Sequence, residues 1–327
     1  MKKTLKNIFL ILKGDFFLRK LNSTPRILFW HGVDQIVDQN VEAESFDIFT
    51  FKRQIAYLNK YYEIISLDEF YNRYQSKKFT NREAVLTFDD GYLNNLNVVY
   101  PILNELNLPF TVFVSTEHIE TGELFPTSIA RLIVYGADLK KINVPFLKID
   151  NEDILDIENR NIIYSKVINA LKSKPLEEVR RIVSELKTNL SDQDYITLVE
   201  KFKSVKPMNW EEVKKLHSLG VTIGSHCKYH ICCHSNQDEQ EVKAQIIDSK
   251  NIIEQKLQTE CKYFAYPNGD YTEVSNDFVK TAGYKMGFST EKSIKIENAH
   301  DTSIIPRIGV PLNLKTFKIF INLYPKK

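Results

Sequence analysis

Two neighbouring carboxylates, Asp89 and Asp90, follow a short apolar run and are the first residues in the chain that suggest chemistry. Residues 84–88 predict a short buried strand, and Gly91 lets the backbone turn sharply where that strand ends. The carboxyl ends of core strands are where α/β folds place their reactive groups. Two negative charges side by side repel each other, so such a pair is stable only if a cation lies nearby or if the two carboxylates have different roles. We therefore expect one carboxylate to bind a metal and the other to act as a base.

A pair of histidines, His226 and His230, favours this interpretation over an ordinary Asp-Asp-Gly turn, which the same residues would also suit. The two histidines are four residues apart, so on a helical turn they would share a face. They follow Gly224 and a short β-like run, residues 221–223. Two imidazoles and one carboxylate form a common site for zinc or a related divalent ion, with positions left open for water and substrate.

The elements that must position these groups alternate between strands and helices. The pattern predicts strands at residues 26–31, 63–65, 84–88, 110–114, 263–266, 285–289 and 304–310, and helices at residues 50–61, 98–106, 240–257, 275–282 and 314–324. Thr50 is the predicted N-cap of the first of these helices. Strand–helix alternation of this kind indicates an α/β fold with parallel βα units.

Three motifs, in this order, resemble those of the polysaccharide deacetylases, also known as the NodB-homology family or carbohydrate esterase family 4. The similar segments are Thr-Phe-Asp-Asp-Gly at residues 87–91, His-Cys-Lys-Tyr-His at 226–230 and Phe-Ala-Tyr-Pro-Asn-Gly at 264–269. The resemblance implies a distorted (β/α) barrel of about seven strands, with its site at the carboxyl ends of the strands. It covers residues 26–116 and 207–312 and leaves residues 120–206 unexplained.

The resemblance also implies roles for individual residues. Asp90, His226 and His230 would bind a divalent metal, with Zn²⁺ expected and Co²⁺, Ni²⁺ or Mn²⁺ as alternatives, while Asp89 would act as the catalytic base. The implied substrate-binding residues, from the third motif and from the segment before the histidines, are Tyr266, Pro267, Asn268, Gly269 and Trp210. Aromatic residues at such places also commonly belong to the core.

The chain departs from the usual family pattern at two places. The third motif usually carries an arginine where this chain has Ala265, and the late Leu-x-His motif that supplies a general acid is absent near the C-terminus. A subgroup that acts on exopolysaccharides has a permuted order, with the acid histidine in an N-terminal strand, in a Tyr-His-x-Val-like motif that residues 28–33 resemble. By this resemblance His31 is the expected acid, and Arg307 is the candidate for the missing arginine.

We predict three parts from these patterns. Residues 1–25 contain a basic and apolar helix, residues 26–119 and 207–327 form the barrel, and residues 120–206 form a helical insertion. Residues 154–190 of the insertion are rich in Glu, Lys, Leu and Ile at helical spacing. The insertion could be a lid, a substrate- or partner-binding cap, or a scaffold without a direct role.

The composition is that of an ordinary soluble protein. Hydrophobic residues make up 43% of the 327 residues and charged residues 26%, and the net charge of +2 gives no reason to expect nucleic-acid binding. The apolar run within residues 8–18 is too short to span a bilayer, and it predicts no secretory signal. Its basic flank suits a helix on a membrane surface, although a helix packed on the domain is equally compatible. We therefore expect the protein in the cytoplasm or at the inner membrane face.

The expected function is hydrolytic. The resemblance implies removal of N-acetyl groups from amino sugars of a bacterial surface polysaccharide, a lipopolysaccharide or a lipid-linked precursor. A deformylase or another C–N amide hydrolase would use the same metal chemistry. A catalytically silent carbohydrate-binding protein is the third possibility, and Ala265 is the feature in its favour.

Overall fold

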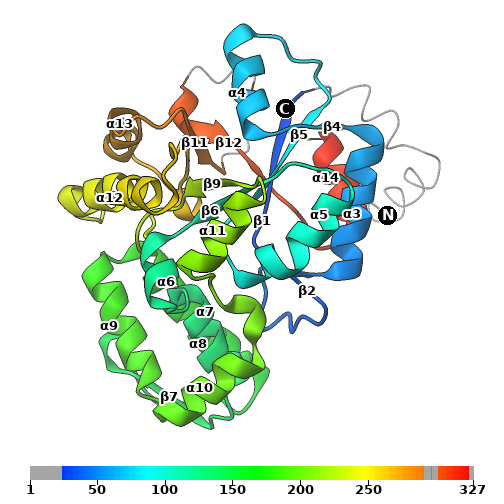
Figure 1. Cartoon of the computed structure of the whole chain (residues 1–327). Helices are drawn as coiled ribbons and strands as arrows, with labels where there is room; N and C mark the ends of the chain where they lie inside the picture. Colours follow the sequence, from blue (N-terminus) through cyan, green and yellow to red (C-terminus); the bar gives the residue numbers. More distant parts are fainter. Residues whose placement is uncertain (1–23, 291–295, 297–300, 324–327) are drawn as a thin grey trace.

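The computed structural model describes residues 24–290, 296 and 301–323 (Figure 1). Its centre is a sheet in which every pair of neighbouring strands is parallel. The order across the sheet is β12 (Ile305–Pro306), β11 (Met286–Ser289), β10 (Tyr263–Ala265), β9 (Thr222–Ser225), β6 (Thr111–Val114), β5 (Glu83–Phe88), β1 (Arg26–Trp30) and β13 (Ile308–Gly309), with β4 (Glu63–Ile64) also beside β5.

The two ends of this sheet belong to one segment of the chain. Only Arg307 separates β12, which pairs with β11, from β13, which pairs with β1. Residues 305–309 therefore join the two edges, and the sheet closes into a barrel. With these residues counted as one strand, the described part of the closed path contains seven strands. The predicted (β/α) barrel is confirmed.

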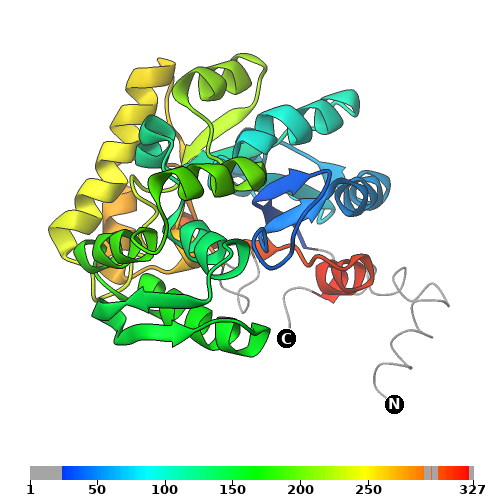
Figure 2. The ribbon, with the colours of Figure 1, turned by 90° about the horizontal axis from the view of Figure 1, so that it is seen from below.

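Helices cover the outside of this barrel (Figure 2). They include α3 (Ile48–Tyr61), α4 (Leu67–Ser76), α5 (Tyr100–Glu105), α6 (Thr116–Thr121), α11 (Trp210–Ser218), α12 (Glu239–Leu257), α13 (Glu273–Thr281) and α14 (Leu314–Leu323). The predicted N-cap Thr50 is wrong. The Asp47 side chain accepts a hydrogen bond from the Thr50 backbone N–H at 2.9 Å, so Asp47 caps α3.

The segment 120–206 forms a group of helices on one side of the barrel (Figure 1). It contains α7 (Pro126–Arg131), α8 (Ile157–Ser173), α9 (Leu176–Lys187) and α10 (Asp192–Lys201). It also contains an antiparallel pair, β7 (Lys141–Val144) and β8 (Ile149–Asp153), that the sequence analysis did not predict. The buried face of α9 belongs to the same hydrophobic core as the barrel, so the segment packs as part of one body.

Within the part of the chain that the structure describes, no helix is both long and apolar enough to cross a membrane. The helix predicted within residues 1–25 lies almost wholly outside the described residues.

Candidate active site

The strand β5 delivers the two acids to the carboxyl end of the barrel. The Asp89 backbone N–H donates to the carbonyl of Trp30 at 2.9 Å, which extends the pairing with β1 beyond the strand. Asp90 and Gly91 then both have a φ of 71°, in the left-handed region. A Cβ at Gly91 would lie 2.8 Å from Cγ1 of Val114, so this turn requires glycine. Both carboxylates are only 3% exposed, unlike those of an ordinary surface turn.

The two histidines lie in an irregular segment, residues 226–238, which we call the His loop. The predicted helical turn is wrong, because Cys227 and His230 have φ values of 62° and 55° and the segment follows β9 without forming a helix. These two left-handed residues fold the loop back on itself. The imidazole centroids of His226 and His230 are consequently 4.8 Å apart, so the two rings meet without a helix.

Neighbouring elements hold the backbone of the His loop. The Ser115 hydroxyl donates to the carbonyl of His226 at 2.6 Å, and the Glu117 backbone N–H donates to the carbonyl of Lys228 at 2.8 Å. From α12, Oε1 of the buried Gln245 accepts from the backbone N–H groups of Lys228 and Tyr229, at 3.1 and 2.7 Å. Four polar backbone groups around the two histidines thus have partners in neighbouring elements, although this segment has no regular secondary structure.

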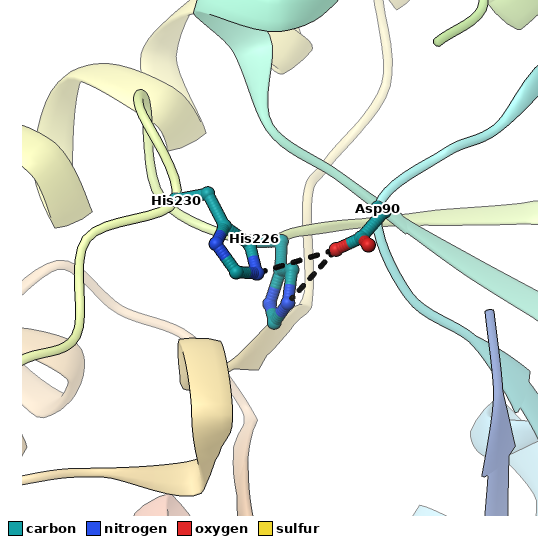
Figure 3. Close-up of side chains that lie close together, drawn as sticks. All are labelled: Asp90, His226 and His230. Carbon is teal, nitrogen blue, oxygen red and sulfur yellow. Dashed lines mark ion pairs between the residues drawn. The ribbon is translucent and has the colours of Figure 1, made fainter. Parts of the chain in front are cut away.

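Asp90 faces both imidazoles (Figure 3). Its Oδ1 lies 3.7 Å from Nε2 of His226 and 3.3 Å from Nε2 of His230. This buried oxygen has no hydrogen-bond partner among the described residues. Burial opposes the ionisation of Asp90, but the His230 charge outweighs it and holds the pKa of the carboxyl well below its usual value.

The histidine tautomer fits a metal site. Nδ1 of His226 lies 2.7 Å from the carbonyl oxygen of Ala265, which can only accept, so Nδ1 carries the proton and Nε2 presents its lone pair toward Asp90. Burial lowers the pKa of His226 to about 4, so the ring is neutral. One carboxylate oxygen without a hydrogen bond and two imidazole nitrogens, all within 4.8 Å of one another, are a donor set suited to a divalent transition metal, whose binding would displace the proton of His230.

Asp89 faces a different partner. Arg307 donates from Nη1 to Oδ1 and from Nη2 to Oδ2 of Asp89, each at 2.7 Å, and Nη1 also donates to the Thr87 hydroxyl at 3.1 Å. The guanidinium is buried, with its carbon 4.7 Å from the ring centroid of Phe29. Burial opposes the ionisation of Asp89, but the Arg307 charge holds the pKa of this carboxyl below its usual value. Arg307, the candidate for the missing arginine, therefore contacts the acid that is expected to act as the base.

A cavity of about 340 Å³ joins the predicted residues. Its lining includes Asp89, Asp90, His31, His226, His230, Arg307, Tyr266, Asn268 and Gly269. Trp210 and Pro267 are not among the described residues that line it. The Trp210 ring instead lies beneath Lys256, whose Nζ is 5.3 Å from the ring centroid, and Pro267 is buried beneath the turn that it begins.

Glu44 lines the same cavity and was not found from the sequence. One ligand atom of each of Glu44, His31 and Asp90 lies within 4.8 Å of the others. Arg131 of α7 donates to Oε1 of Glu44 at 2.8 Å. Burial opposes the ionisation of Glu44, but the Arg131 charge lowers the pKa of this carboxyl to about 2. No motif marks Glu44, which lies in an acidic stretch between short strands.

Comparisons with known proteins agree with this barrel and these motifs. A family model described as "Polysaccharide deacetylase" matches residues 76–144 and 163–287, together more than half of the chain. The protein described as "Putative polysaccharide deacetylase YxkH", from Bacillus subtilis, is 27% identical over 81 residues, which are 25% of this chain. The match spans only 29% of that relative's length.

Solved structures share the fold over nearly the whole chain. The deacetylase PplD of Streptococcus pyogenes, in complex with acetate, is 16% identical with a TM-score of 0.57, covering 89% of this chain and 94% of that one. IcaB from Ammonifex degensii is 14% identical with a TM-score of 0.58, covering 93% of this chain and 98% of that one. At these identities the likeness concerns the fold. On the strength of the family match, this chain belongs to the polysaccharide deacetylase family.

Proposed function

We propose that the protein is a metal-dependent N-deacetylase that removes acetyl groups from amino sugars of a bacterial surface glycan or its lipid-linked precursor. The observation that carries the proposal is the division between the two adjacent acids. Asp90 faces two imidazoles, whereas Asp89 forms a two-fold hydrogen-bonded pair with Arg307. Such a division gives neighbouring carboxylates separate roles, one as a metal ligand and one as a base.

Asp90, His226 and His230 would hold the metal, and zinc is the ion that we propose. When bound, a divalent ion supplies a Lewis acid that polarises the acetamide carbonyl and makes water more acidic. This proposal is supported by the neutral His226 ring and by the unpartnered oxygen of Asp90. The predicted cytoplasmic or inner-membrane location also remains part of the proposal.

The remaining steps use side chains that border the cavity. Asp89, kept ionised by Arg307, accepts a proton from water as its oxygen adds to the carbonyl carbon. The backbone N–H of Asn268 donates to the carbonyl oxygen as negative charge develops there. His31 gives a proton to the leaving nitrogen as the C–N bond breaks. The products are acetate and a free amino sugar.

The test is acetate release from N-acetylglucosamine oligomers and crude surface glycan, with protein that has been stripped of metal and reloaded with zinc. We expect acetate release that depends on zinc and disappears in Asp90→Ala. If the wild type binds stoichiometric zinc and releases formate but no acetate, a deformylase is favoured. Failure of the wild type to bind any metal would overturn the proposal.

A further inference from the structure

We infer that the cavity accepts a terminal amino sugar and excludes the interior of a glycan chain, because residues 120–206 bridge its rim at three places. This inference rests on the proposed function and concerns which sugar of the substrate can enter. An interior sugar needs two openings, one for the chain on each side, whereas a terminal sugar needs only one. The three bridges connect the insertion to three separate segments that border the cavity.

The first bridge joins α7 to the loop between β2 (Gly32–Asp34) and β3 (Ser45–Asp47). Arg131 of α7 forms an ion pair with Glu44 at 2.8 Å, and their side chains are 12% and 30% exposed. Pro126 and Thr127, at the start of the same helix, line the cavity. The ion pair is thus largely shielded from solvent. It holds α7, which forms part of the cavity wall, against the loop that follows β2.

The second bridge joins the turn between α8 and α9 to the His loop. Oε1 of Gln237 accepts from the Leu176 backbone N–H at 3.0 Å, and Nε2 of Gln237 donates to the carbonyl of Lys174 at 3.2 Å. Nδ2 of the neighbouring Asn236 donates to the carbonyl of Ser173 at 3.0 Å. Gln237 is 7% exposed and also lines the cavity. This side of the wall is therefore fixed to the segment that carries His226 and His230.

The third bridge joins the end of α8 to the turn at residues 267–269. Nζ of Lys172, at the end of α8, donates to Oδ1 of Asn268 at 2.8 Å. Both side chains are exposed, and both residues line the cavity. Asn268 is held from the other side, where its Nδ2 donates to Asp270 at 2.6 Å. A glycan that passed between the insertion and the 267–269 turn would have to break this contact.

The size of the cavity agrees with entry of a single chain end. Its volume of about 340 Å³ is near the lower limit of the roughly 300–1,000 Å³ that is typical of small-molecule sites. Phe320 of α14 adds another part of the wall, and α14 lies well apart from α9 in both views (Figures 1 and 2). The described residues that line the cavity therefore come from separate elements, and they surround a space about the size of one sugar.

The direct test is to locate the acetyl group that is lost. Zinc-loaded wild type is incubated with an N-acetylglucosamine hexamer labelled at its reducing end, and the products are sequenced by mass spectrometry. We expect each chain to lose one acetyl group, from an end sugar, and the rate per chain to be the same for dimer and hexamer. Early loss of several acetyl groups from interior sugars would overturn the inference while leaving the deacetylase activity established.

A matched pair of variants tests the third bridge. Lys172→Ala removes the contact with Asn268, so we expect the ratio of interior to terminal deacetylation to rise. Lys166→Ala is the control, because this lysine lies on the same helix but donates to the Lys148 carbonyl at 3.1 Å and does not line the cavity. The control should keep the wild-type pattern. A Lys172→Ala pattern identical to that of the wild type would contradict the role of the bridge.

A binding measurement separates this inference from the proposed chemistry. Calorimetric titration of zinc-loaded Asp89→Asn with N-acetylglucosamine oligomers of increasing length does not require turnover. A cavity for one chain end predicts a dissociation constant that stays constant from dimer to hexamer. Affinity that rises about tenfold or more with length would show that further sugars are bound along a groove and would overturn the inference. Absence of acetate release together with length-independent binding would reject the proposed function alone.

Discussion

Nη1 of Arg307 donates a hydrogen bond to Oδ1 of Asp89 and Nη2 donates one to Oδ2, each at 2.7 Å. The arginine lies between β12 and β13, where the sheet closes, and Asp89 follows β5. Both side chains are buried. Loss of either partner therefore leaves the other largely buried charge without its counter-ion.

The energetic coupling of this pair can be measured by a double-mutant cycle. We expect Arg307→Met to lower the free energy of unfolding by about 3–5 kcal/mol, because it strands the buried Asp89 charge. Adding Asp89→Asn to this variant should recover part of the loss, since no unpaired carboxylate remains. Denaturant titration of the wild type, both single variants and the double variant gives the coupling. Additive losses would contradict the interpretation of a mutually compensating pair.

The roles of the two acids can be separated by a substitution at Asp89 alone. Asp89→Asn keeps the shape of the side chain but removes the base, so we expect kcat to fall by about 10²–10⁴-fold. Zinc stoichiometry, measured by elemental analysis, should stay at the wild-type value because Asp90, His226 and His230 are unchanged. Loss of zinc together with activity would show that Asp89 is a ligand.

Metal binding should stabilise the folded protein, because the three proposed ligands, Asp90, His226 and His230, converge only after folding. At a free zinc concentration one hundred times the dissociation constant, we expect a gain of about 2.7 kcal/mol in the free energy of unfolding. Chelation should reverse the gain, and Asp90→Ala should show none. Thermal unfolding with and without zinc measures this effect. If zinc stabilises the wild type and Asp90→Ala equally, the metal binds elsewhere.

Gln245 should contribute to metal affinity without touching the metal. Its Oε1 accepts from the backbone N–H groups of Lys228 and Tyr229, which lie between His226 and His230. We expect Gln245→Leu to weaken zinc binding by about 10–100-fold, the usual effect of losing an outer support of a metal site. Gln255→Leu, at an exposed position on the same helix, is the control. Competition with a chromophoric chelator measures both affinities, and equal values would contradict the role of Gln245.

His118 should make stability depend on pH. Its ring is buried between Phe125 and Tyr229, at centroid distances of 4.2 and 4.8 Å, and burial lowers its pKa from 6.5 to about 4. The unfolded chain binds this proton more readily than the folded protein does. The contribution of the neutral His118 ring to the free energy of unfolding is therefore complete above pH 6.5 and is lost as the pH falls toward 4. The loss is on the order of 3 kcal/mol. We expect metal-free His118→Phe to show a shallower decline than metal-free wild type in urea unfolding at several pH values; parallel declines would assign the effect to other groups.

The positions of the strands and of the two acids were predictable because short apolar runs mark buried strands and glycine marks the turn after them. The His pair was found for a partly wrong reason. The predicted helical turn is absent, and the two rings meet because Cys227 and His230 adopt left-handed conformations that four-residue spacing does not reveal. Arg307 was inferred from a resemblance and does contact Asp89. The metal ligation itself stays a prediction.

The contacts that the sequence did not indicate join residues that are far apart along the chain. Glu44 meets Arg131, and Lys172 meets Asn268, through contacts that only the folded barrel brings together. Glu44, Arg131 and Lys172 belong to no motif or periodic pattern, and the third motif indicated Asn268 as a substrate-binding residue but not its contact with Lys172. The β7–β8 hairpin was also missed, because its strands are short and β8 is almost entirely exposed and acidic, so it lacks the alternation that indicates a half-buried strand.

Because residues 305–309 close the sheet, we expect the order of synthesis to determine when the protein becomes active. A nascent chain that has not yet reached these residues already contains Asp90, His226 and His230, yet its sheet has two open edges and Asp89 has no counter-ion. We therefore expect such a chain to be inert toward acetylated sugars, and a proteolytic cut before Ile305 to inactivate the mature protein. Docking of residues 305–309 would then be required for activity, so that only a completely folded chain could hydrolyse the substrate.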